Sequence, residues 1–133
     1  MQNDIISSVF AIHPRVRYVA VASGQHVELR QREGLAGASS SESDRYEELL
    51  VNPTLLMLTS QRGDIDCGGL RYVIVRYGNF AQVVVPRPEE GHVSIAVEPD
   101  VDPVPIGDAV VRLLGREDAP GVARGGDHVP GVR

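Results

Sequence analysis

Three short runs of alternating apolar residues in the second half of the chain constrain the fold most. They cover residues 70–77, 80–85 and 92–97, and only short connections separate them. Gly78 and Asn79 suit a two-residue hairpin turn of the type that needs a positive φ, and residues 86–91 form a polar loop with two prolines. Because strands joined by such connections pair antiparallel, the sequence predicts a three-stranded meander.

The first half of the chain predicts a helix followed by a hairpin. Apolar residues recur at helical spacing over residues 4–12, and Pro14 ends that helix because a residue before proline is pushed out of the α region. Residues 15–23 are rich in β-branched side chains, and residues 26–32 alternate in polarity. A turn signal at 23–25 joins these two strands.

A long helical stretch is predicted between the hairpin and the meander. It begins near Asp44, where Ser41 and Asp44 have the spacing of a capping box. Asn52 followed by Pro53 is typical of a helix start, so this stretch is either two consecutive helices or one kinked helix. It runs to Gln61 and stops at Gly63, and residues 64–69 are expected to form a loop.

This helical stretch is apolar on nearly all sides, although a helix packed on one side needs only a narrower stripe. Its apolar residues are Leu49, Leu50, Val51, Leu55, Leu56, Met57 and Leu58. Two explanations remain open. Either one side packs on the sheet and the other on a partner, or the whole helix is buried within the monomer.

The chain ends with one more predicted helix and a tail. Asp102 and Pro103 repeat the cap-then-proline signal, and Gly115 suits the residue after the helix end. Residues 1–115 are therefore predicted to form one domain and residues 116–133 a disordered tail rich in Gly, Pro and charge. The fold class is α+β: a five-stranded antiparallel sheet with helices on both faces, in the order α-β-β-α-β-β-β-α.

Composition excludes several classes of function. The formal net charge of −5 argues against binding the phosphates of a nucleic acid. The single cysteine rules out an intrachain disulfide and a multi-cysteine zinc site. No apolar run reaches the roughly 20 residues of a membrane span, and no signal-peptide pattern begins the chain. We therefore expect a cytoplasmic protein.

No residues are predicted to be catalytic, to bind a cofactor or to hold a metal. Asp64, Asp66 and Cys67 form the only compact cluster of metal-ligand type, and a solvated loop explains them better. His26 and His92 alternate with apolar strand residues, so both are expected to face water. Four arginines on neighbouring strands could form a local basic strip, but we expect a solvated sheet face instead: Arg15, Arg17, Arg71 and Arg76.

The element order resembles the roadblock/dynein light chain family, whose fold is profilin-like, and small prokaryotic roadblock-like proteins in particular. The resemblance rests on residues 14–21, 70–73 and 98–102 and extends over about residues 3–115 by element order. It implies a homodimer formed through the central helix and the adjoining edge strand, and binding to small GTPases or to larger protein assemblies. Pro53 departs from the family, because that helix usually runs unbroken. The interface candidates are Leu49, Leu50, Leu55, Leu56, Leu58, Tyr72 and Ile74.

Two functions from different classes follow as hypotheses. The first is a non-enzymatic homodimeric interaction or scaffold module, with a small GTPase as the candidate partner. The second is a small-ligand sensor with a closed apolar cavity between the sheet and the central helix. An enzyme would depend on Cys67, Asp64 and Asp66 alone.

Overall fold

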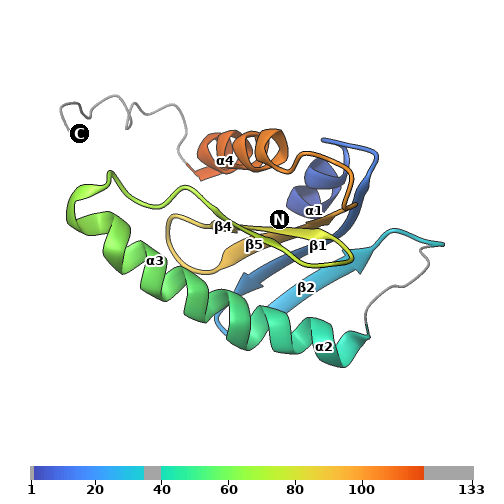
Figure 1. Cartoon of the computed structure of the whole chain (residues 1–133), viewed down its shortest axis with the longest axis horizontal. Helices are drawn as coiled ribbons and strands as arrows, with labels where there is room; N and C mark the ends of the chain where they lie inside the picture. The colour runs from blue at the N-terminus through green and yellow to red at the C-terminus, as the bar shows by residue number, and fades with distance from the viewer. Residues whose placement is uncertain (1, 35–39, 119–133) are drawn as a thin grey trace.

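The computed structural model of the chain describes residues 2–34 and 40–118. Its elements are α1 (Gln2–Phe10), β1 (Val16–Ser23), β2 (His26–Gln31), α2 (Ser41–Tyr46), η1 (Glu47–Val51), α3 (Asn52–Asp66), β3 (Val73–Arg76), β4 (Ala81–Pro86), β5 (His92–Val97) and α4 (Val104–Asp118). Here α2, η1 and α3 follow one another without a break, and we call residues 41–66 the central helix (Figure 1). The predicted element order is therefore confirmed.

The five strands form one sheet in the order β2-β1-β5-β4-β3. Every neighbouring pair is antiparallel, as predicted, and β2 and β3 are the edge strands. The turn between β3 and β4 differs from the prediction because Gly78 does not have a positive φ. The Tyr77 N–H donates to the Phe80 carbonyl at 2.9 Å, which closes the turn without a left-handed glycine there.

One face of the sheet carries the aliphatic core and is covered by α1 and α4 (Figure 1). Alternate strand residues point to this face because side chains of a strand alternate between its two sides. The sheet contributes Val19, Val21, Val83, Val85, Val93, Ile95 and Val97, and the two helices contribute Ile5, Ile6, Val9, Ile106, Val110 and Leu114. This layer supplies most of the buried apolar surface of the domain.

The opposite face of the sheet is covered by the central helix (Figure 1). Apart from Val84, the side chains there are mostly small or polar: Tyr18, Ala20, Gln82, His92, Ser94 and Ala96, all buried. A helix that packs on such a surface meets hydrogen-bonding groups instead of an aliphatic layer. This arrangement sets the chemistry of the candidate site.

Pro53 neither splits nor ends the central helix, so of the two alternatives drawn from the sequence the two separate helices are wrong and a single helix is found. A proline inside a helix lacks an N–H and collides with the carbonyl four residues earlier. The turn just before it is widened into the π-helical segment η1, where the Asn52 N–H donates to the Glu47 carbonyl five residues back. The wider turn accommodates the proline, and the helix continues into α3.

Gly63 does not stop the central helix either, so the predicted loop over 64–69 is wrong at its start. Gly63 is buried inside α3, where an added Cβ would lie 3.2 Å from the Leu70 backbone nitrogen. It therefore lets the following segment pass close to the helix. The chain leaves the helix after Asp66, and Gly68 and Gly69, which both have a positive φ, follow directly after the helix end.

The helix ends depart from the predictions by small shifts. The central helix is capped by Ser40 Oγ, which accepts from the Ser43 N–H at 3.1 Å, so the cap lies one residue before Ser41. The first helix ends at Phe10, before Pro14 is reached.

The cap at Asp102 is confirmed, since its Oδ1 accepts from the Val104 N–H at 3.1 Å. Helix α4 continues through Gly115 to Asp118, so Gly115 is not its end and residues 116–118 are helical. The rest of the predicted tail, 119–133, lies outside the described residues.

Candidate functional site

The central helix is inverted relative to an ordinary surface helix: its sheet side is polar, and its outer side exposes large apolar side chains, with the exposed Thr54 and Gln61 among them. Glu48 and Asn52 are completely buried against the sheet, with Leu56 beside them. On the outside, Leu50 and Leu58 remain 55% and 59% exposed. An amphipathic surface helix normally buries its leucines and exposes its charges. The inversion therefore requires an explanation on each side.

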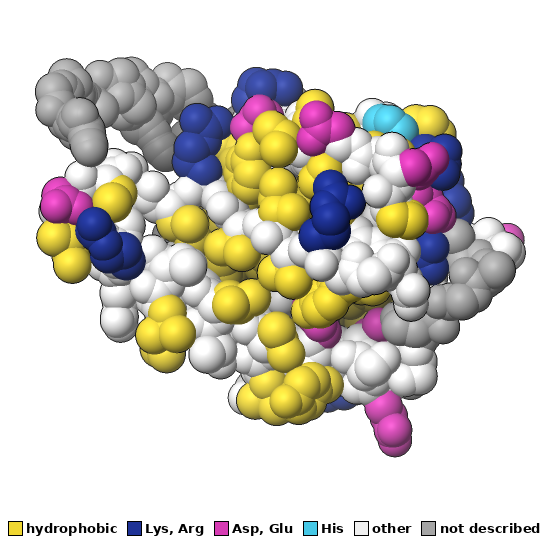
Figure 2. Space-filling model, in the orientation of Figure 1, with side chains coloured by type: hydrophobic (Ala, Val, Ile, Leu, Met, Phe, Trp, Pro, Cys, Tyr) yellow, Lys and Arg dark blue, Asp and Glu magenta, His cyan; other side chains and the backbone are white. Residues whose placement is uncertain are grey.

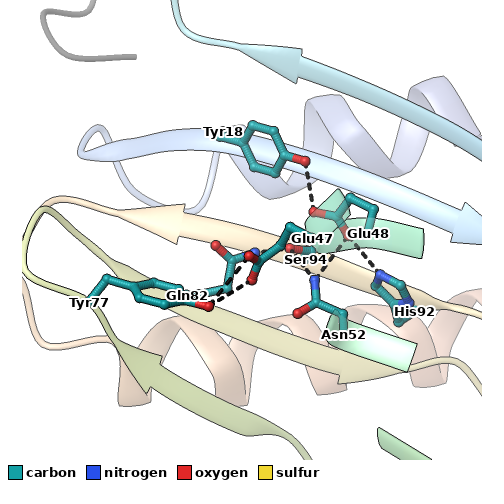
Figure 3. A network of polar contacts seen from close by, with 8 residues as sticks. All are labelled: Tyr18, Glu47, Glu48, Asn52, Tyr77, Gln82, His92 and Ser94. Carbon is teal, nitrogen blue, oxygen red and sulfur yellow. Dashed lines mark hydrogen bonds and ion pairs between the residues drawn. The ribbon is translucent and has the colours of Figure 1, made fainter. Parts of the chain in front are cut away.

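Glu48 is the centre of the buried polar side (Figure 3). Its Oε2 accepts a hydrogen bond from the Tyr18 hydroxyl at 2.7 Å, and its Oε1 accepts from Asn52 Nδ2 at 3.1 Å. His92 Nε2 also lies 2.7 Å from Oε1. Because an ionised carboxylate can only accept, His92 Nε2 is the donor of this contact. A buried carboxylate with three donors is stabilised where a solitary one would not be.

The network continues along the sheet through Ser94 of β5. Asn52 Nδ2 also approaches the Ser94 hydroxyl, at 3.4 Å, and Gln82 of β4 donates to the same hydroxyl. Asn52 Oδ1 is buried and has no hydrogen-bond partner among the described residues. The central helix is thus held to β1 and β5 by directional bonds, which fix its position more narrowly than apolar packing does, and Gln82 extends the network to β4 through Ser94.

Burial and the Glu48 carboxylate act together on Tyr18. Burial raises the pKa of the Tyr18 hydroxyl far above its usual range, and the negative charge of Glu48 and the hydrogen bond to it raise it further. The hydroxyl therefore stays protonated in the folded protein at neutral pH, where it donates to Glu48.

A pocket of about 400 Å³ lies beside this network, under the first half of the central helix. Its walls come from the start of β1, the end of β2, the turn between β3 and β4, and the helical residues Ser43, Asp44, Glu47 and Glu48. Tyr18, Tyr77 and Phe80 add aromatic surface. The predicted cavity between sheet and helix is therefore present, but it opens to solvent and carries carboxylates, whereas a closed apolar cavity was expected.

Apolar side chains gather on the outer side of the central helix and over the strands beside it (Figure 2). Leu50, Met57 and Ile65 recur at seven- or eight-residue steps, about two helical turns, so they share one face with Leu58. We call these four residues the outer stripe. Edge strand β3 has no neighbouring strand on its far side within the described chain.

The structure divides the predicted interface residues between several environments. Leu50 and Leu58 belong to the outer stripe, Leu49 and Leu55 are half-buried, and Leu56 is buried against the sheet. Tyr72 and Ile74 lie on the other side of the sheet, packed against the aliphatic core. The Tyr72 ring packs on Gly107, and its hydroxyl donates to Asp108 at 2.9 Å. These two side chains are therefore internal contacts and not part of the outer stripe.

The candidate metal cluster is not assembled. Asp66 is the last residue of α3 and pairs with Arg62 at 2.7 Å, and Cys67 follows it, exposed. No group of three or more metal-ligand side chains that could hold an ion occurs within residues 2–34 and 40–118. In the same part of the chain, no helix is long and apolar enough to cross a membrane.

The four arginines of the candidate basic strip do not form one, because each has a partner within the chain. Three of them face carboxylates: Arg15 with Asp100 at 2.8 Å, Arg17 with Glu98 at 3.2 Å, and Arg71 with Asp108 at 3.6 Å. Arg76 donates to the Pro99 carbonyl. Their charge is therefore largely matched within the chain itself.

The two strand histidines were predicted to face water, and this is wrong for one of them. His26 is exposed, but His92 is buried and bonded to Glu48. The central polar residues were all missed from the sequence, although two signals mark them. Glu48 and Asn52 are polar residues four apart in a leucine-rich helix, and His92 and Ser94 alternate with valine and isoleucine. A polar set at helical spacing and another at strand spacing are what a polar helix–sheet contact requires.

No protein-family model and no curated protein matches the sequence. Solved structures do match the fold. The roadblock/LC7 domain from Streptomyces avermitilis superimposes with a TM-score of 0.64 and 14% identity, over 85% of this chain and 90% of that one.

Two bacterial Mgl proteins match in the same way. The gliding protein MglB from Thermus thermophilus gives a TM-score of 0.63 at 8% identity, over 86% of this chain and 85% of that one. MglC from Myxococcus xanthus gives a TM-score of 0.51 at 14% identity, over 86% of this chain and 93% of that one. The chain therefore has the roadblock fold, as the sequence resemblance implied.

Proposed function

We propose that this chain is a homodimeric interaction module of roadblock type that binds or regulates a protein partner and catalyses no reaction itself. The observation that carries the proposal is the inverted central helix. The hydrogen bonds of Glu48 hold its sheet side on the domain, so its outer stripe is not needed for that attachment. An exposed apolar stripe of this kind is typical of a protein contact.

The outer stripe and the edge strand β3 suit contact with a second copy of the chain. Burying a leucine side chain completely is worth about 1.5–3 kcal/mol, and Leu50 and Leu58 still expose more than half of their surface. In a two-fold dimer the outer stripe of one copy meets the outer stripe of the other, so a single surface has to be complementary to itself. The free side of β3 can add strand pairing to the same contact.

The partner class comes from the resemblance and not from the site. Roadblock proteins commonly bind small GTPases, and a small GTPase is therefore the first partner to test. A structure of MglB with the same fold is described as having a tetrameric arrangement. A dimer of this chain that presents one combined surface to a partner agrees with these likenesses.

The dimer is tested by light scattering of the full chain at micromolar concentration. We expect the mass of a dimer, and we expect Leu58→Glu to give a monomer because it places a charge in the contact. Val104→Glu is the matched control, since Val104 is an exposed apolar residue on α4, on the other side of the sheet. A wild-type monomer, or an equal effect of both substitutions, contradicts the dimer.

The partner is tested by titrating a small GTPase, in its GDP and GTP forms, into the wild-type chain. Binding that Leu58→Glu abolishes and Val104→Glu leaves intact supports a partner surface that needs the dimer. Absence of binding in both nucleotide states removes the GTPase from the proposal.

The pocket under the first half of the central helix supports a second candidate function, the binding of a small ligand. Its volume of about 400 Å³ falls in the range of small-molecule sites. A ligand there would contact both the sheet and the helix that bears the outer stripe. Ligand binding and self-association would then be coupled through one helix.

A further inference from the structure

The pocket under the central helix is lined by more acidic than basic residues. Asp44, Glu47 and Glu48 bring three carboxylates to it within two turns of helix, and the Gln31 side chain donates to Asp44 at 3.1 Å. Arg17 is the one basic residue among those that line the pocket, and its guanidinium is paired with Glu98. The pocket therefore presents an excess of negative charge to a ligand.

Glu47 is the carboxylate best placed to meet a ligand. Glu48 is fully buried and already accepts from Tyr18, Asn52 and His92. Glu47 is only half-buried, and the Tyr77 hydroxyl donates to its oxygens at 3.2 and 3.4 Å. Partial burial, together with the negative charges of its neighbours, raises the pKa of the Glu47 carboxyl. A positive group close to Glu47 would relieve this unfavourable charge.

Aromatic rings border the same space. Tyr77 and Phe80 form a tilted pair with ring centroids 5.2 Å apart, and Tyr18 contributes a third ring to the lining. Aromatic faces attract organic cations through the ring quadrupole and also accept an alkyl chain. Carboxylates beside aromatic rings favour a guanidinium or ammonium group with an apolar body over a bare metal ion.

We propose that this pocket binds an organic cation, a guanidinium or alkylammonium group that Glu47 pairs with and that Tyr77 and Phe80 enclose. The cation comes either from a free small molecule or from an arginine or lysine side chain of a protein partner. This proposal rests on the ligand-binding candidate function, and it holds whether or not the chain forms a dimer.

The test is an NMR titration of the full-length, ¹⁵N-labelled chain with three probes. Butylguanidinium represents a free cation, an acetyl-Gly-Arg-Gly-amide peptide represents a side chain, and N-butylurea is a neutral analogue. We expect a cationic probe to shift the amide signals of Glu47, Tyr77 and Phe80, and N-butylurea to leave them in place. Tighter binding of butylguanidinium would indicate a free small molecule as the ligand, and tighter binding of the peptide would indicate a side chain of a protein partner.

Glu47→Gln tests the charge without removing the side chain's bulk, since the glutamine carbonyl can still accept from Tyr77. We expect this substitution to lower the affinity for the cationic probe by about tenfold or more, which is the usual effect of losing a charged hydrogen-bond partner. Glu42→Gln is the control, because Glu42 is an exposed acid in the first turn of the same helix that does not line the pocket. It should leave the affinity unchanged.

Three results would overturn the proposal: no shift with either cation, equal weakening by both substitutions, or tighter binding of N-butylurea. The last result would still leave the pocket as a ligand site, so it separates the cation from the wider function. Light scattering of the same samples reports the dimer independently.

Discussion

Glu48 and His92 lie 44 residues apart in the sequence and meet side chain to side chain, with Glu48 Oε1 2.7 Å from His92 Nε2 and both residues buried. The contact joins the central helix to β5. Tyr18 and Asn52 supply the remaining donors to the carboxylate. The fold therefore uses a buried polar network to locate this helix, and Leu50 and Leu58 remain on the outside.

Glu48→Ala should be one of the most damaging single substitutions in the chain. It removes the acceptor of three buried donors, and breaking a buried charged contact by deleting one partner typically costs about 3–5 kcal/mol. Urea unfolding monitored by circular dichroism measures this loss. Glu89→Ala, at an exposed loop position, should change the stability by less than about 0.5 kcal/mol. A loss below about 1 kcal/mol for Glu48→Ala would mean that the network does not hold the helix.

Stability should fall in the alkaline range because of Tyr18. Its pKa in the folded protein is raised above the ordinary value of 10.0. The stabilisation is therefore fully present below pH 10 and is lost as the pH rises further, since only the unfolded chain then releases the proton. Denaturant unfolding between pH 8 and 11 should show this decline, and Tyr18→Phe should flatten it. An identical slope in the variant would contradict the assignment.

Leu56→Ala and Leu58→Ala should behave differently although the residues are two positions apart. Leu56 is 8% exposed and faces the sheet, so its truncation should cost about 2–5 kcal/mol at any protein concentration. Leu58 is exposed in the isolated chain, so its truncation should matter only where the chains associate, and the loss should grow with protein concentration. Thermal unfolding at several concentrations separates the two. Equal, concentration-independent losses would place both leucines in the core.

Gly91→Ala should destabilise the fold more than Gly68→Ala. Both glycines have a positive φ, +88° and +82°, so an alanine at either position is strained by about 1–3 kcal/mol. At Gly91 the added methyl group would also collide with the Ala22 carbonyl, whereas nothing lies near it at Gly68. The difference in unfolding free energy between the two variants isolates the steric part. A larger loss at Gly68 would contradict the packing of the β4–β5 turn against β1.

The strands were predictable because their signal is local. Alternation over a few residues marked His92–Val97 with its observed bounds, and short connections fixed the antiparallel order. The helix end at Gly63 was wrong because a glycine required by a tertiary contact cannot be told from a capping glycine in one dimension. The choice between one helix and two at Pro53 stayed open for a similar reason, since a π-turn that accommodates a proline has no sequence signature of its own.

The polar network could not be predicted, since it depends on pairing between distant segments. Gln82 and Ser94 share a face of the sheet only through the register of β4 with β5, in which Ser94 pairs with Val84 and Gln82 with Ala96. Glu48 is linked to this face through Asn52, whose amide donates to the Glu48 carboxylate and lies 3.4 Å from the Ser94 hydroxyl. By contrast, the excess of leucines on the central helix was visible in the sequence, and the structure shows which of them face outward.

In the native assembly the outer stripe should be covered by protein, and the rate at which hydrogen peroxide oxidises Met57 reports that coverage. Met57 is 53% exposed in the single chain and lies between Leu50 and Ile65 on the stripe. We expect its oxidation, followed by mass spectrometry, to slow as the protein concentration rises, and Leu58→Glu to restore the fast rate. Oxidation as fast as in a free methionine peptide at every concentration would show that the stripe stays uncovered.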